Sequence, residues 1–115
     1  MELFPQFYVY NKETGQVHAT NDIQAAEKQF IDQESRQVGL DTVGDTVVST
    51  VFIGIPYAEG MLFETVVYPY HANGEKYWEK FVSRYQTAGD AKRGHKKVVK
   101  MIKKEQERNK NDCVL

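Results

Sequence analysis

Side chains of the kinds that bind metals or act as nucleophiles are few in this sequence, and they lie far apart. There are three histidines, His18, His71 and His95, and one cysteine, Cys113. No histidine has a second histidine or a cysteine two to four residues away, which is the spacing of a local metal pair. The sequence also contains no phosphate-binding loop, no dinucleotide fingerprint and no nucleophile elbow. It therefore predicts no catalytic residue, no metal ligand and no cofactor.

Two polar side chains are candidates for a functional role because they stand among apolar residues. Glu64 interrupts an apolar run, where a carboxylate is costly to bury without a partner. We expect it to face solvent or to bond to Arg84, Tyr68 or a backbone donor; a ligand-facing role is the alternative. His95 falls on the apolar face of an expected helix, and a histidine there is most often a core residue with one satisfied hydrogen bond.

A basic surface is the clearest candidate binding feature. Residues 1–90 carry six Lys and Arg against thirteen Asp and Glu, a net charge of −7, and residues 91–115 carry nine against three, a net charge of +6. Such a surface suits the phosphates of a nucleic acid or another polyanion. The alternative is a solvated face, or one that lies against the acidic body of its own or a neighbouring chain. The cations of one helical arc are Arg93, Lys96, Lys97, Lys100, Lys103 and Lys104.

Aromatic residues form a second candidate contact surface. Aromatic side chains serve well as interface anchors, and the candidates here are Phe7, Tyr8, Tyr10 and Tyr57. An aromatic hairpin edge would also allow the chain to self-associate as a homo-oligomer. Burial of one face of the hairpin is the alternative for the first three residues.

These side chains need a sheet and two helices to position them. The apolar runs VVSTVFIGI, which begins at Val47 and ends before Pro56, and MLFETVVYPY, which begins at Met61, predict two adjacent strands. Further strands are predicted in a hairpin at 7–20 that turns at Gly15, at 36–43 and at 81–87. The predicted architecture is α+β, a four- to five-stranded mainly antiparallel sheet packed against helices at about 22–35 and 88–104.

The two helices have start signals in the sequence. Asn21 followed by Gln24 predicts the first helix, whose apolar stripe should lie on the sheet. Thr87 followed by Asp90 predicts the start of the second helix, whose apolar arc of about 100° contains His95. Beyond residue 104 the pattern becomes polar, so we expect 105–115 to be a frayed tail of a single domain that spans 1–115.

Composition restricts the class of protein. Of the 115 residues, 41% are hydrophobic and 27% are charged, which is typical of a soluble globular domain. No apolar run approaches the roughly 20 residues of a membrane-spanning helix, and the first residues lack the pattern of a secretory signal. We therefore expect no membrane association and a cytoplasmic location.

Five segments, in order along the chain, resemble those of one family. They are TVGD from Thr42, VSTVFIGI from Val48, LFETVVY from Leu62, RYQT from Arg84 and the glycine–histidine pair ending at His95. They resemble a family of small proteins encoded by tailed bacteriophages and prophages, with the patterns STVFLGLDH, LFETMVF and RYSTxEEAxxGH. The resemblance covers residues 36–99, and YVYNKETGQ from Tyr8 is similar to the family's opening turn.

This chain differs from the family's pattern at two places. Ile55, Pro56 and Tyr57 replace the Leu-Asp-His that follows the family's first strand, and residues 88–90 replace its acidic helix start. Any chemistry of that Asp-His pair is therefore absent here. The basic C-terminal helix is also unusual for the family. The resemblance implies a phage origin and a shared fold, and it brings no activity with it.

Origin and missing chemistry together suggest a function. Small phage proteins without catalytic motifs often bind and inhibit a host factor, so we expect a non-enzymatic inhibitor of a bacterial host or defence factor. An anti-CRISPR-like protein is the specific expectation, acting in the cytoplasm of the host cell on a host or defence protein complex. The alternative is a nucleic-acid-binding or polyanion-binding accessory protein that acts through the basic C-terminal helix.

Overall fold

The structure is a computed structural model that describes residues 7–57, 60–69 and 81–112. Within these ranges, only the backbone of residues 55–57, 81–82 and 109–112 is described. His71, Cys113 and the side chain of Tyr57 consequently lie outside the described part of the chain.

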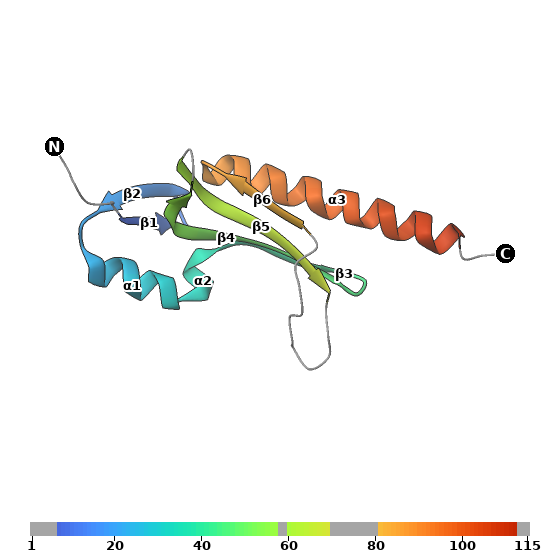
Figure 1. Ribbon diagram of the computed structural model, residues 1–115, viewed down its shortest axis with the longest axis horizontal. Coiled ribbons are helices and arrows are strands. Elements are labelled where there is room, and N and C mark those ends of the chain that lie inside the picture. Colours follow the sequence, from blue (N-terminus) through green and yellow to red (C-terminus); the bar gives the residue numbers. More distant parts are fainter. Residues whose placement is uncertain (1–6, 58–59, 70–80, 113–115) are drawn as a thin grey trace.

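The described residues form two antiparallel sheets and three helices, and they confirm the α+β fold (Figure 1). One sheet has two strands and the other has four in the order β3-β4-β5-β6. The strands are β1 (Phe7–Asn11), β2 (Gln16–Thr20), β3 (Gln37–Val43), β4 (Thr46–Tyr57), β5 (Met61–Pro69) and β6 (Phe81–Tyr85). The helices are α1 (Ile23–Ile31), α2 (Gln33–Arg36) and α3 (Ala88–Asp112).

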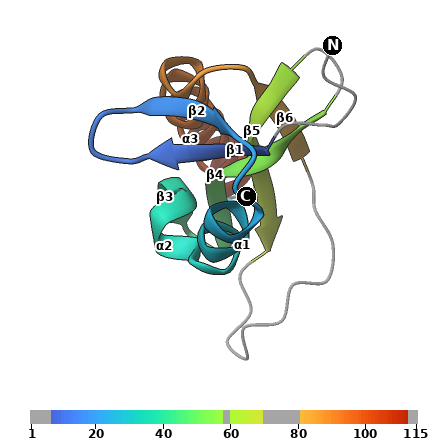
Figure 2. The ribbon, with the colours of Figure 1, turned by 90° about the vertical axis from the view of Figure 1, so that its left-hand side faces the viewer.

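The helices lie on opposite sides of the strands. Figures 1 and 2 show α3 along one face of the four-stranded sheet, with α1 on the other side of β1 and β4. The β1–β2 hairpin, α1 and α2 gather at one end of the molecule, and α3 continues past the opposite end of the sheet. The helices α1 and α3 therefore lie on different sides of the molecule.

Aromatic rings join the hairpin to the larger sheet. The ring of Tyr10 stacks on Phe52 with their centroids 5.5 Å apart and meets the edge of Phe63 at 5.3 Å. Ala88 and Ala91 of α3 belong to the same buried cluster. Tyr10 is 5% exposed, so it serves the core rather than a protein interface. Burial also raises the pKa of its phenol above the usual value of 10.0.

The turns follow the glycines, and β4 is longer than the sequence predicts. Gly15 and Gly44 have φ values of 77° and 61°, as the two predicted turns require. The expectation that the strand ends before Pro56 is wrong, because β4 continues to Tyr57. The ladder to β5 becomes irregular between Phe52 and Tyr57, and an irregular stretch tolerates a proline that donates no hydrogen bond.

The first helical segment is divided where one continuous helix is expected. Asp22, rather than Asn21, caps α1, and its carboxylate accepts a hydrogen bond from the Ala25 amide at 3.2 Å. Asp32 ends α1 and caps α2 by accepting from the Ser35 amide at 3.4 Å. The helix is divided at Asp32 because an aspartate side chain accepts hydrogen bonds from nearby backbone amides. Aspartate therefore favours the ends of helices over their interiors.

The last helix begins as predicted and continues beyond the predicted end. The Thr87 hydroxyl accepts a hydrogen bond from the Asp90 amide at 3.1 Å, which confirms the expected start. The helix reaches Asp112, so residues 105–112 are helical rather than a frayed tail. Gln106 helps to hold this part, because its Nε2 donates to the Val43 carbonyl at 2.7 Å.

Candidate functional site

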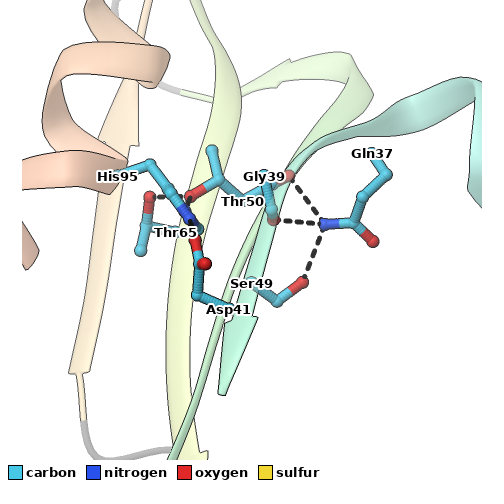
Figure 3. A network of polar contacts seen from close by, with 7 residues as sticks. All are labelled: Gln37, Gly39, Asp41, Ser49, Thr50, Thr65 and His95. Carbon is cyan, nitrogen blue, oxygen red and sulfur yellow. Dashed lines mark hydrogen bonds and ion pairs between the residues drawn. The ribbon is translucent and has the colours of Figure 1, made fainter. Parts of the chain in front are cut away.

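His95 is the centre of a polar network that joins α3 to three strands (Figure 3). Its Nδ1 lies 2.8 Å from Thr50 Oγ1, and its Nε2 lies 2.6 Å from Asp41 Oδ2. Thr50 Oγ1 in turn lies 2.5 Å from Thr65 Oγ1. The expectation of a buried core histidine is confirmed, but the ring makes two hydrogen bonds where one was expected.

The direction of the hydrogen bonds follows from the chemistry of the carboxylate. An ionised Asp41 only accepts, so His95 Nε2 carries the hydrogen that it donates. In the neutral ring Nδ1 then accepts from the Thr50 hydroxyl, which accepts from the Thr65 hydroxyl. Both ring nitrogens of His95 and both buried threonine hydroxyls thus have a partner, as a low-dielectric interior requires.

Gly39 and Gln37 shape the strand beside the network. A Cβ atom on Gly39 would lie 2.8 Å from the imidazole of His95, so the ring occupies the space that a side chain would need. The side-chain amide of Gln37 donates through Nε2 to the carbonyls of Gly39 at 2.6 Å and Thr50 at 3.0 Å. These bonds satisfy the backbone where the register between β3 and β4 shifts.

The order hydroxyl, imidazole and carboxylate is also that of a hydrolase triad, but the exposures are reversed. A nucleophile must reach its substrate, whereas Thr50 is 0% exposed beneath α3. The carboxylate that orients a catalytic histidine is ordinarily buried, and the side chain of Asp41 is 54% exposed. The network therefore stabilises the contact between α3 and the sheet and presents no nucleophile.

Glu64 has a structural partner. Its Oε2 lies 3.1 Å from Nε of Arg84, the residue directly opposite it on β6. This confirms the expectation that Glu64 bonds to Arg84, and it accounts for a carboxylate in an apolar strand.

The basic face of α3 is the set of six exposed cations that the sequence predicts. Of these six cations, only Arg93 has an ion-pair partner among the described residues, and this partner is Asp90 at the start of the same helix. A shallow pocket of about 170 Å³ lies between the basic face and β3. Asp41, His95 and Val99 contribute to its wall. The members of the basic face are Arg93, Lys96, Lys97, Lys100, Lys103 and Lys104.

A larger hollow lies between α1, β1 and β4, and we call it the α1 groove. It has a volume of about 640 Å³, and its lining is mostly apolar. No residue of α1 is buried. Ile23, Phe30 and Ile31 line the groove and are 53%, 61% and 81% exposed. The expectation that the apolar stripe of this helix packs on the sheet is therefore wrong.

Polar contacts explain why the stripe stays exposed. The side-chain amide of Gln29 accepts from the Tyr10 amide at 2.8 Å and donates to the Tyr10 carbonyl at 2.7 Å. The glutamine thus pairs with β1 as a neighbouring strand would. The helix is anchored by this polar residue, and its large apolar side chains are left along the groove.

Arg36 forms a polar point in the wall of the groove. Its Nη1 donates to the Phe52 carbonyl at 3.3 Å, and its guanidinium lies 5.1 Å from the ring centroid of Phe30. Its Nε is buried and has no acceptor among the described residues. A buried donor without a partner costs about 1–3 kcal/mol.

The aromatic candidates divide among different environments. Phe7 and Tyr8 are half-buried and line the α1 groove, whereas Tyr10 is in the core. Sequence reasoning missed the groove itself, together with the roles of Gln29 and Arg36. The aliphatic and aromatic residues of α1 were a signal, but the pattern predicts burial as readily as exposure.

No three His, Cys, Asp or Glu side chains in the described part of the chain gather closely enough to hold a metal ion. None of the described helices is long and apolar enough to cross a membrane. Comparisons of the chain with protein-family models, curated proteins and solved structures found no match. The function is therefore inferred from this chain's own residues.

Proposed function

We propose that the protein is a non-enzymatic accessory protein, encoded by a phage or prophage, that binds and inhibits a bacterial host or defence protein through the α1 groove. The observation that carries the proposal is the exposed apolar groove with an arginine in its wall. The phage origin rests on the resemblance of residues 36–99 to phage proteins.

The apolar side chains of the groove favour a protein partner. Contiguous exposed apolar patches are uncommon on soluble domains and mark sites of interaction. Three large apolar residues of α1 are more than half exposed, and they extend the lining outward as a rim. A rim of this kind suits a protein segment that lays an apolar side chain between α1 and β1.

Arg36 restricts the chemistry of the partner. Its guanidinium places a positive charge beside the apolar lining of the groove, and a carboxylate or a backbone carbonyl is the group that accepts hydrogen bonds from a guanidinium. Phe30 and Phe52 hold the guanidinium in place before binding, which reduces the entropy lost in complex formation. We therefore expect a partner segment that combines an aliphatic or aromatic side chain with an adjacent acceptor.

In the proposed mode, the bound protein inhibits its partner by covering the partner's surface, without catalysing a reaction. The hydroxyl–imidazole–carboxylate chain is buried at its nucleophile end, which supports a binding role over a catalytic one. An anti-CRISPR-like mode, in which the bound protein blocks a defence effector in the cytoplasm, is the specific form that we propose.

Paired serine variants test the groove. I23S/I31S removes two exposed apolar side chains from the groove, and L40S/M101S removes two comparably exposed ones from elsewhere. Tagged wild type and both variants are incubated with nuclease-treated host lysate, and the captured proteins are quantified by mass spectrometry. We expect one host protein to be retained by wild type and by L40S/M101S and to be reduced at least tenfold by I23S/I31S.

Inhibition is measured in the same variants. Phage plating on a host that carries the captured defence protein should rise with wild type and with L40S/M101S, and not with I23S/I31S. Equal capture by all three proteins, or a loss confined to L40S/M101S, would contradict binding through the groove.

A further inference from the structure

We infer that the basic face of α3 is a second binding site, which takes the sugar–phosphate backbone of nucleic acid without reading its sequence. This site is separate from the α1 groove and does not depend on the function proposed for it. Spacing, absence of local neutralisation and rigidity of the helix support the inference.

Four cations of the basic face form a straight row. Arg93, Lys97, Lys100 and Lys104 follow one another at intervals of four, three and four residues, so they lie on one line along α3. At about 1.5 Å per residue the row is about 16 Å long. One strand of a duplex advances about 3.4 Å per nucleotide, so the row spans about five phosphates.

The charges of the three lysines of the row are not neutralised within the described structure. Residues 91–104 contain seven Lys and Arg and no Asp or Glu. Among the described residues, Arg93 of this helix pairs with Asp90, and no lysine takes part in an ion pair. Unpaired cations on a helix of this length form a positive field that attracts a polyanion.

The opposite side of α3 fixes the direction in which the lysines point. Ala91 and Val98 are buried against the sheet, and His95 is bonded to both Thr50 and Asp41. A helix held in this way cannot rotate its cations toward the acidic part of the same chain. The positive row is therefore organised before binding, which lowers the entropic cost of the complex.

The cations of the basic face should not contribute equally to the binding of nucleic acid. Lys96, Lys100 and Lys103 line the pocket that they share with Asp41, whose carboxylate repels a phosphate. Lys97 and Lys104 lie on the far side of the face and do not line that pocket. We therefore expect Lys97 and Lys104 to contribute more to binding than the three lysines beside β3.

The chemistry of the face favours the backbone over the bases. Between Arg93 and Lys104 no aromatic residue is available to stack on a base. Lysines contact phosphates as point charges, so affinity should depend strongly on salt and little on sequence. Figures 1 and 2 place α3 and α1 on opposite sides of the strands, so we expect that nucleic acid on α3 and a protein in the α1 groove can be bound at the same time.

Binding of a fluorescent 20-nucleotide duplex, followed by anisotropy, tests the site. The variant K97Q/K100Q/K104Q removes three positive charges from the row. The matched control, Q16E/N21D/Q33E, makes the same change of net charge with similar side-chain sizes at exposed positions outside α3. Both variants are first checked for wild-type unfolding midpoints in urea.

We expect wild-type affinity to fall roughly 100-fold between 50 and 200 mM salt, as about four phosphate contacts predict. The lysine variant should bind at least tenfold more weakly at 50 mM salt, with a salt slope about 2–3 smaller, and the control should bind like wild type. A second duplex of unrelated sequence should bind equally.

Three results would overturn the inference. They are the absence of salt-dependent binding by folded wild type, equal weakening by the control, and salt-sensitive self-association that the lysine variant abolishes while no duplex binds. The last result would assign the face to the acidic surface of a second copy. Because I23S/I31S leaves α3 intact, its duplex binding separates failure at this site from failure at the α1 groove.

Discussion

Asp41 Oδ2 on the edge strand β3 lies 2.6 Å from Nε2 of His95 on α3, although the two residues are 54 positions apart in the sequence. The other nitrogen of the His95 ring bonds to the buried hydroxyl of Thr50. One histidine therefore connects the surface of the edge strand to the centre of the sheet. The basic face depends on this connection, because it holds α3 in its orientation.

Loss of the His95 ring should destabilise the protein far more than loss of the Asp41 charge. His95→Ala leaves a cavity and removes the acceptor of the Thr50 hydroxyl, which should lower the free energy of unfolding by about 2–4 kcal/mol. Asp41→Asn keeps an acceptor for Nε2–H at a half-exposed position and should cost less than about 1 kcal/mol. Urea unfolding measures both, and equal losses would contradict the importance of the buried bond.

Substitution of Gly39 by alanine should reveal its contact with the same ring. The new Cβ would lie 2.8 Å from the imidazole of His95, so we expect a loss of about 1–3 kcal/mol in the free energy of unfolding. In a His95→Ala background the same substitution should cost much less, because the space is then free.

Gly89→Ala is the control for that substitution. Its Cβ would make an ordinary contact, 3.5 Å from Arg93 Nη1, within the first turn of α3. An alanine there should be neutral or stabilise the protein by up to about 1 kcal/mol. Additive effects of Gly39→Ala and His95→Ala would show that the two positions are not in contact.

Gln29 should control how firmly α1 is attached. Gln29→Ala removes both bonds to the backbone of Tyr10 and should cost about 1–2 kcal/mol. Hydrogen exchange of the Tyr10 amide should accelerate by about tenfold or more, since its acceptor is lost. Gln24→Ala, on the exposed side of the same helix, should leave that exchange unchanged; equal acceleration in both variants would place the anchor elsewhere.

Tyr10 should make the protein sensitive to alkaline pH. Burial raises the pKa of its phenol in the folded state, so above about pH 10 the unfolded chain loses this proton before the folded chain does. The contribution is complete below the pKa of the unfolded chain and is lost as pH rises toward the higher pKa of the folded state. Tyr10→Phe should therefore lose less stability than wild type between pH 9 and 11 in urea unfolding, and parallel losses would argue against this origin.

The sequence by itself determined the elements whose patterns are local. Strand alternation in residues 47–55, the glycines of the turns and the amphipathic pattern of α3 all depend on neighbours within a few positions. The basic face belongs to this group, because helical spacing alone places its cations on one side. The α+β class and the exposure of these cations could therefore be predicted.

Only the tertiary structure decided which side chains are partners. The contacts of His95 depend on the register of β3 against β4 and on the path of α3 across the sheet, and no short sequence pattern encodes either. The same holds for the α1 groove, because the bonds between Gln29 and Tyr10 fix a helix whose apolar stripe by itself predicts burial. Long-range geometry therefore turned an expected core helix into an exposed surface and gave a buried histidine a partner at the edge of the sheet.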